Sequence, residues 1–210
     1  SIASVNNRVS NTFTVETGGS EALRVDSSQR LLLGTTTEGH ESANDFTVSD
    51  SGDVGITIRS TDSNQTQISF SDATSGTGEY AGQISYFHSD NYMRFRTNSE
   101  ERVRITSGGD VGIGLTNPQH ILHLHKADSG TNYLQITNST TGSTSTDGAL
   151  FGLNADEDVI VWQRESNNIQ LGTNNAERVR ITSAGLVGID NTSPGTKLAI
   201  GDGTIDSSNV

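Results

Sequence analysis

The sequence predicts an all-β chain in which three-stranded meanders alternate with larger β inserts. Three observations indicate this class. Apolar and polar residues alternate over short runs, which is the period of a strand with one buried face. Clusters of Ser, Thr, Asn and Gly separate the runs, and these residues favour turns. No window of about twelve residues carries the i, i+3, i+4, i+7 apolar stripe of an amphipathic helix.

An internal repeat organises the 210 residues. The segment Glu101–Ser107 recurs with the same sequence as Glu177–Ser183, and Glu21–Ser27 is a looser copy. The match extends downstream to three short apolar segments, Leu31–Gly34, Val111–Gly114 and Val187–Ile189. A repeat of this kind indicates a duplicated scaffold, in which chemistry usually belongs to the segments between the copies.

Each copy is predicted to form three antiparallel strands with one apolar face. In the second copy, that face comprises Met93, Phe95, Val103, Ile105, Val111 and Ile113. Strict alternation places Arg94, Arg102 and Arg104 on the opposite face. A partial fourth copy of the last hairpin is predicted around Asp50–Asp53, with the apolar residues Phe46, Val48, Val54 and Ile56.

The repeats divide the chain into seven segments. These are a connecting segment (1–12), the first meander (13–34), β insert 1 (35–92), the second meander (93–114), β insert 2 (115–168), the third meander with a following strand (169–200), and a tail (201–210). The strands expected in the inserts are Val54–Ile58, Gln67–Phe70, Ala81–His88, Leu122–His125, Tyr133–Thr137, Ala149–Leu153 and Val159–Gln163. Residues 74–78 and 139–147 are expected to be loops.

The composition predicts a chain that is disordered, folds as thin layers, or shares its core with neighbouring chains. Only 30% of residues are hydrophobic and 5% are aromatic. The apolar face of one meander is too small to offset the conformational entropy lost on ordering it. Joint burial of the same face by several chains removes this deficit. The residues expected in that shared core are Val103, Ile105, Val111, Ile113, Val179, Ile181, Val187 and Ile189.

Charge and apolar runs exclude several classes of partner. The 13 basic residues are scattered among 25 acidic ones, and the net charge of −12 argues against nucleic acid and anionic membrane surfaces. Apolar runs such as Leu31–Leu33 are far too short to span a bilayer, so no membrane insertion is expected. The chain has no cysteine and therefore no disulfide or thiolate metal site.

The repeat resembles a known family of shaft repeats. Glu101–Gly114 is followed by Thr116-Asn117-Pro118 and then Leu122-His123-Leu124, and the pattern returns from Glu177 to Ile200. This order resembles the ERMRI…VGIG…KLHV repeat of phage tail fibres and tailspikes, often found in marine and cyanobacterial phages upstream of an endosialidase-type intramolecular chaperone. Two departures are Gln29 and Asp190, which stand where the family has glycine, so these two turns are expected to differ locally.

The resemblance implies an elongated, parallel homotrimer located in the virion, as a tail or capsid appendage. Its function would be structural and adhesive, attaching the virion to the host cell through a surface glycan or protein receptor, alongside other virion proteins. Two alternatives remain: a bacterial surface adhesin built on the same repeat, and a polysaccharide-degrading tailspike. No enzymatic activity and no cofactor is expected. A glycosidase needs two carboxylates facing each other, and the sequence does not place Asp72, Glu79 or Asp156 in that way.

Three groups of residues are candidates for binding. His123 and His125 share a strand face, and around a threefold axis such strands present six imidazoles to a divalent transition metal; packed or solvent-facing histidines are the favoured interpretation, and His120 lies on the other face. Asn154, Asp156 and Asp158, with Glu157 between them, offer oxygen ligands to Ca²⁺, although acidic turns are common in this chain. Aromatic residues that can stack on sugars or pack in the inserts are Tyr80, Tyr86, Phe87, Tyr92, Tyr133 and Trp162.

Overall fold

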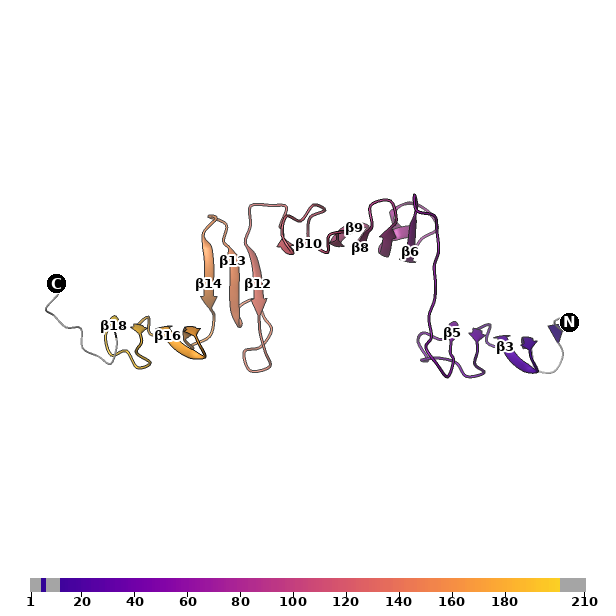
Figure 1. Cartoon of the computed structure of the whole chain (residues 1–210), viewed down its shortest axis with the longest axis horizontal. Helices are drawn as coiled ribbons and strands as arrows, with labels where there is room; N and C mark the ends of the chain where they lie inside the picture. Colours follow the sequence, from indigo (N-terminus) through magenta and orange to yellow (C-terminus); the bar gives the residue numbers. More distant parts are fainter. Residues whose placement is uncertain (1–4, 7–11, 201–210) are drawn as a thin grey trace. The chain divides into compact units, whose positions relative to one another are not determined.

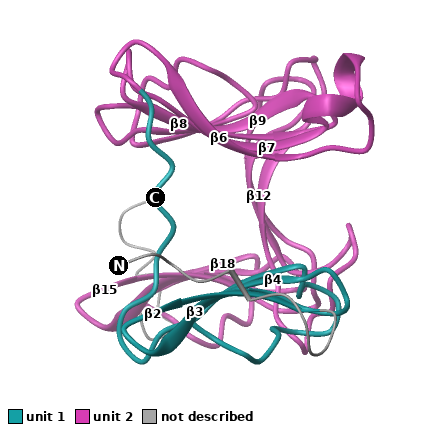
Figure 2. Cartoon of the chain, turned by 90° about the vertical axis from the view of Figure 1, so that its right-hand side faces the viewer, with its two compact units in different colours: residues 1–60 teal, residues 61–210 magenta. Residues whose placement is uncertain are grey.

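The protein is all-β, as the sequence predicts, in a computed structural model that describes residues 5–6 and 12–200. Contacts divide the chain into two units, residues 1–60 and 61–210 (Figure 2). Of the expected connecting segment and tail, residues 1–4, 7–11 and 201–210 lie outside the described residues.

The strands form four sheets, one in the first unit and three in the second (Figure 1). The first unit has the sheet β1 (Val5–Asn6), β2 (Phe13–Thr17), β3 (Ser20–Val25), β4 (Leu31–Leu33) and β5 (Phe46–Val48). The six-stranded sheet consists of β6 (Gln65–Phe70), β7 (Gly82–Phe87), β8 (Tyr92–Thr97), β9 (Glu100–Ile105), β10 (Val111–Ile113) and β11 (Leu122–Leu124). The remaining two sheets are β12 (Asn132–Ile136), β13 (Ala149–Leu153) and β14 (Val159–Gln163), and then β15 (Ile169–Thr173), β16 (Ala176–Ile181), β17 (Val187–Ile189) and β18 (Leu198–Ile200).

The same four-strand arrangement occurs in three of the sheets. Strands β2–β3–β4, β8–β9–β10 and β15–β16–β17 pair antiparallel in chain order. A fourth strand then pairs parallel to the third, as β5 does with β4, β11 with β10 and β18 with β17. In the six-stranded sheet, β6 and β7 extend the antiparallel order on the side of β8. The sequence predicted strands at Leu122–His125 and after the third meander, but it did not predict that they pair in parallel with the third strand of the repeat.

Glycine and proline shape the crossover that leads to the parallel strand. The crossover after β10 passes over Gly112, where an added Cβ would lie 2.7 Å from the Leu115 carbonyl oxygen and 3.4 Å from Pro118. Pro118 is buried against this strand, and Pro194 is buried in the same way beside Gly188. The glycine in the middle of the short third strand therefore makes room for the proline-containing crossover.

Two expected details differ from the structure. No strand forms at Val54–Ile58, because β5 pairs in parallel with β4 and the chain does not turn back to complete the partial fourth hairpin. The expected loop at 74–78 instead contributes to the 3₁₀ helix η1 (Gly76–Tyr80) between β6 and β7. The strands predicted at Ala149–Leu153 and Val159–Gln163 are confirmed with the same bounds.

The hairpin turns have residues with positive φ at equivalent positions in each copy. The first turn of each copy is a two-residue loop with both residues at positive φ, as in Asn98–Ser99 and Asn174–Asn175. The second turn is a three-residue loop whose last residue has positive φ. That residue is glycine in two copies, and Gln29 takes the same conformation with φ 67°. Asp190 likewise has φ 52°. The expectation that Gln29 and Asp190 alter their turns is therefore wrong: both adopt the glycine-like conformation.

A side chain at the start of the second turn closes the loop. The Asp26 Oδ1 atom accepts the backbone N–H of Arg30 at 3.0 Å, and Thr106 Oγ1 accepts that of Asp110 at 3.1 Å. Thr182 Oγ1 makes the same bond to the N–H of Leu186 at 3.1 Å. Asp and Thr at this position satisfy a backbone donor that the loop would otherwise leave unpaired.

Replacing Gln29 by glycine is expected to stabilise the protein. A residue with a Cβ in the left-handed region costs about 1 kcal/mol, and glycine removes that cost. Gln29→Gly should raise the free energy of unfolding by about 0.5–1 kcal/mol in urea titrations. Ser28→Gly, at the neighbouring position with negative φ, should lower it instead. Equal effects of the two substitutions would contradict the assigned turn.

Candidate functional site

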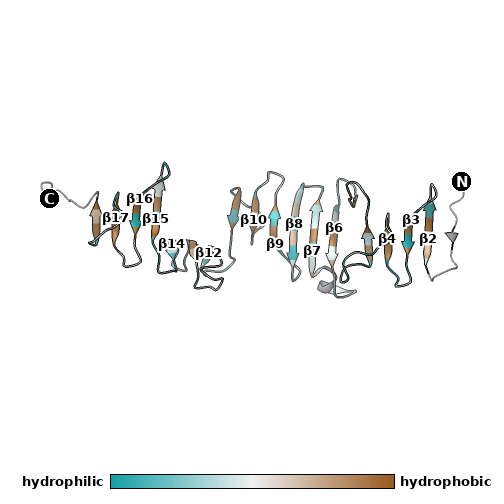
Figure 3. Cartoon of the chain, turned by 90° about the horizontal axis from the view of Figure 1, so that it is seen from below, coloured by the Kyte–Doolittle hydropathy of each residue, from teal (hydrophilic) through white to brown (hydrophobic). Residues whose placement is uncertain are grey.

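The six-stranded sheet carries two continuous apolar rows on one face. The register aligns one side chain from each strand, with Ile105 opposite both Met93 and Val111. The first row is Ile68, Ile84, Phe95, Val103, Ile113 and Leu124. The second row, after Thr66, is Tyr86, Met93, Ile105, Val111 and Leu122. Figure 3 shows the alternation of hydrophobic and hydrophilic residues along the strands.

Equivalent rows occur on the sheets of the other two copies. In the first unit they are Phe13, Val25, Leu31 and Phe46, and Val15, Leu23, Leu33 and Val48. In the last sheet they are Ile169, Ile181, Val187 and Leu198, and Leu171, Val179, Ile189 and Ile200. All eight residues expected in the shared core lie in these rows. The register therefore places each set of four on one face of its sheet.

The described residues leave these rows largely uncovered. The buried hydrophobic residues of the described chain are Leu32, Leu150 and Ala199, and none belongs to a row. Leu171 is 57% exposed, and Ile113 is 42% exposed. The sheet β12–β13–β14 has a comparable exposed apolar face, formed by Leu134, Ile136, Phe151, Leu153, Val159 and Val161. Contiguous exposed apolar surface of this kind marks an interaction site.

A β-bulge organises the opposite, polar face. Glu101 is opposite Arg96 and Val103 is opposite Phe95, so Arg102 is an extra residue without a ladder partner. The bulge offsets the alternation by one position, which brings residues i and i+3 to the same face. Glu101 and Arg104 consequently form a two-pronged ion pair with N–O distances of 2.7 and 2.9 Å.

The same ion pair occurs in the other two copies, as Glu21–Arg24 and Glu177–Arg180. The hydrogen bond from Arg24 lowers the pKa of the Glu21 carboxyl, and the bond from Arg180 has the same effect on Glu177. Strict alternation predicted Arg102 on the same face as Arg104, and this prediction is wrong because the bulge turns Arg102 to the other side. Its Nε atom is 3.4 Å from Thr97 Oγ1, and Thr97 lies on the side of Phe95.

Arginines cover the aromatic rings on the polar face of β7–β9. The guanidinium of Arg94 lies 4.4 Å from the centroid of the Phe87 ring, and that of Arg104 lies 3.9 Å from Tyr92. The two rings stack on each other with centroids 4.5 Å apart. Burial lowers the pKa of Arg94, and the charge of Arg96 adds to the shift. These rings are therefore occupied by the protein's own cations and offer no free face to a sugar.

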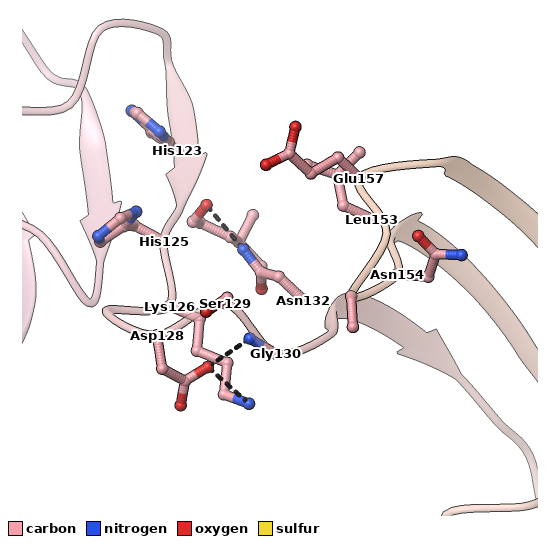
Figure 4. A pocket seen from close by; sticks show the side chains of 12 residues that line it. His123, His125, Lys126, Asp128, Ser129, Gly130, Asn132, Leu153, Asn154 and Glu157 are labelled. Atoms are coloured by element: carbon pink, nitrogen blue, oxygen red, sulfur yellow. Dashed lines mark hydrogen bonds and ion pairs between the residues drawn. The ribbon is translucent and has the colours of Figure 1, made fainter.

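His123 and His125 lie beside a pocket of about 280 Å³ (Figure 4). Residues of β11, the following loop and the β13–β14 turn line this pocket, and Asn132 bridges it by donating to the Leu124 carbonyl at 3.0 Å. His123 is opposite Gly112, so it lies on the face away from the apolar rows. No group of three or more potential metal ligands occurs among the described residues. If the apolar rows face a common axis, His123 points away from that axis.

The acidic segment considered for calcium forms a turn. The Asn154 Oδ1 atom accepts the N–H groups of Asp156 at 3.0 Å and Asp158 at 2.8 Å, and Asn154 Nδ2 donates to Asp158 Oδ2. Glu157 has a φ of 67°, like the last residue of the other three-residue loops. Asn154 therefore has the same role as Asp26 and Thr106, and its oxygen is used within the turn.

The face of the β12–β14 sheet opposite its exposed apolar residues holds a pocket of about 410 Å³, which is larger than the pocket beside His123. Its lining is Thr131, Tyr133, Gln135, Ser145, Thr146, Leu150 and Arg164. The Gln135 amide donates to the carbonyls of Thr144 and Asp147 and so holds the 138–147 loop beside the strand. Trp162 is next to Leu150 in the ladder, is 51% exposed, and lies 5.1 Å from the Arg164 guanidinium.

This pocket combines an aromatic ring, a guanidinium and several hydroxyl groups, which makes it a candidate for binding a polar ligand. The sequence indicated Tyr133 and Trp162 as aromatic residues, but it did not indicate Arg164, Gln135 or the loop hydroxyls. Of the other candidates, Tyr86 donates to Asn91 Oδ1, and Tyr80 lies 5.3 Å from the Arg96 guanidinium. Asp72 and Glu79 lie in one loop, closed by a bond from the Asp72 N–H to the Gly78 carbonyl, whereas Asp156 is in the β13–β14 turn.

Acid is expected to weaken the turn that Asp26 closes. The hydrogen bond from Arg30, at 2.6 Å, together with backbone N–H donors, lowers the pKa of Asp26 in the folded protein. A lowered carboxyl pKa contributes stability above the unfolded pKa of about 4, and that contribution is lost as the pH falls below it. Urea titrations between pH 6 and 2 should show a smaller pH-dependent loss for Asp26→Asn than for the unsubstituted protein. An equal loss in the two proteins would contradict this role of Asp26.

In the described part of the chain, no helix is long and apolar enough to cross a membrane. No protein-family model matches the sequence, and no functionally curated protein is significantly similar to it.

Proposed function

We propose that the chain is a structural and adhesive segment of a phage fibre, a parallel homotrimer that helps to attach the virion to its host cell. The observation that carries this proposal is the set of uncovered apolar rows on the sheets of all three copies. The resemblance of the repeat to fibre shafts supports both the trimer and the location in the virion.

Self-association follows from the position of the rows. A sheet that is apolar on one face is stable in water only when a second layer covers that face. Identical rows from three chains can cover one another around a common axis, since each chain presents the same side chains at the same height. The Glu–Arg pairs then lie on the outward face, where they remain hydrated.

The pocket on the β12–β14 sheet supports the adhesive part of the proposal. Tyr133 lines this pocket, and its phenol can stack on the apolar face of a sugar ring. Trp162 does not line the pocket but is next to the lining residue Leu150 in the ladder, where its exposed indole extends the surface available to a saccharide. The hydroxyls of Thr131, Ser145 and Thr146 match the hydrogen bonds that sugar hydroxyls need. In this proposal, the receptor is a host-surface saccharide that contacts this pocket.

Disrupting an apolar row is expected to dissociate the trimer. Leu171 and Gln170 are neighbours on β15 that face opposite sides, and both are exposed in the single chain. Leu171→Asp should abolish the trimer, because three carboxylates would be buried together at a cost of several kcal/mol each. Gln170→Asp should leave the trimer intact. Sedimentation velocity measures both, and a trimer that survives Leu171→Asp would place the interface elsewhere.

Loss of the pocket side chains is expected to weaken receptor binding. Tyr133→Ala and Arg164→Ala should each reduce binding of the purified protein to host cells or to arrayed surface glycans by about tenfold or more, which corresponds to about 1.4 kcal/mol. The matched control is Arg178→Ala, which removes an exposed arginine from another sheet. Binding that falls equally in all three variants would contradict a saccharide site in this pocket.

A further inference from the structure

The segment after β5 repeats the sequence of a strand but forms none. Asp53-Val54-Gly55-Ile56 is identical to Asp110-Val111-Gly112-Ile113, which includes β10. The preceding apolar pairs also correspond, since Phe46 and Val48 stand as far before Val54 and Ile56 as Val103 and Ile105 stand before Val111 and Ile113. In the second copy, this sequence gives the β9–β10 hairpin, with Val111 opposite Ile105.

In the first unit, the second half of this hairpin is left open. Val54, Ile56 and Ile58 are 50%, 67% and 47% exposed, and the chain between β5 and β6 contains no strand. Within the described chain, no backbone hydrogen bond is made by residues 53–60. A run of alternating apolar residues with unpaired backbone groups is a strand that lacks its partner.

Among the described residues, no strand occupies the place that this strand would take. β5 is the last strand of its sheet and pairs only with β4, so its outer edge carries unpaired backbone groups. By the correspondence with β9, this outer edge is where the equivalent of β10 would bind. Phe46, on the same edge strand, is 48% exposed.

We propose that Val54–Ile56 of one chain pairs antiparallel with the outer edge of β5 in a second copy of the chain. The register is that of β10 on β9, with Val54 opposite Val48 and Ile56 opposite Phe46. This pairing extends both apolar rows of the first sheet by one strand and satisfies the backbone groups of the open segment. It rests on the self-association proposed above and adds a strand exchange to it.

A second copy of the chain is the favoured partner, because residues 53–60 do not fold back onto β5 of their own chain. Exchange of an element between identical chains makes the same contacts as a closed hairpin, at little additional cost. In a trimer, the open segments and the free β5 edges are held close together, and their effective concentration reaches the millimolar range. The chain's own β5 edge is the competing partner, and the experiment distinguishes the two.

Cysteine pairs test the exchange directly, because the chain has no cysteine of its own. Val48→Cys and Val54→Cys are placed on separate chains with tags of different mass, which are co-expressed and oxidised. Directly opposite residues in antiparallel strands have Cα atoms about 4.5–5.5 Å apart, within the range for a disulfide. We expect a covalent heterodimer. The control pairs Val48→Cys with Gly55→Cys, a neighbouring position on the other face where an added Cβ meets no other atom within 4 Å.

The control should give at least tenfold less heterodimer. Absence of heterodimer, or equal amounts from Val54→Cys and Gly55→Cys, overturns the exchange. A chain carrying both Val48→Cys and Val54→Cys that closes only an internal disulfide overturns it as well. Sedimentation of the unsubstituted protein separates the two proposals: a trimer that gives no cross-link overturns the exchange alone, whereas a monomer overturns the trimer. Hydrogen exchange of the unsubstituted protein provides an independent readout, since the amides of residues 54–56 should be protected only in the assembled form.

Discussion

A single-layered sheet with one apolar face cannot be stable in water until a second layer covers that face. In the three sheets of the second unit, the chain itself covers only the opposite face, away from the apolar rows. There the chain's own loops form the second layer, with the proline crossovers over Gly112 and Gly188 and the 138–147 loop beside Leu150. The apolar rows receive no such cover from the described residues, and this asymmetry is the source of the proposed self-association.

The alternation of apolar and polar residues predicted well where the strands lie, but poorly which strands pair with one another. It located the apolar faces because side chains alternate across any strand, whatever lies beside it. It did not reveal the bulge at Arg102, because the apolar spacing of Val103 and Ile105 is the same with or without the extra residue. The spacing of three between Glu101 and Arg104 is the signal that indicates it. The strand predicted at Val54–Ile58 does not form, for a related reason. Apolar alternation specifies which face of a strand is buried, but it does not specify which other strand pairs with its edge.

The candidate sites were predicted only in part, because polar residues in short segments act locally. Asn154 looked like a metal ligand in the sequence, but its side chain closes a turn, as Asp26 and Thr106 do. The pocket on the β12–β14 sheet depends on the placement of a Ser- and Thr-rich loop, and such a loop carries no periodic signal. Tyr133 and Trp162 were recognisable by residue type alone, whereas Arg164 becomes relevant only once the loop is in place.

The hairpin turns also determine the order in which the molecule can form. Each turn closes with bonds between residues at most four positions apart, and each antiparallel strand pairs with its neighbour in the sequence. Contacts of such low sequence separation form quickly, even while the rest of the chain is still being synthesised. Each repeat can therefore reach its local pairing alone, and in the proposed trimer the encounter between chains would be the slow, concentration-dependent step.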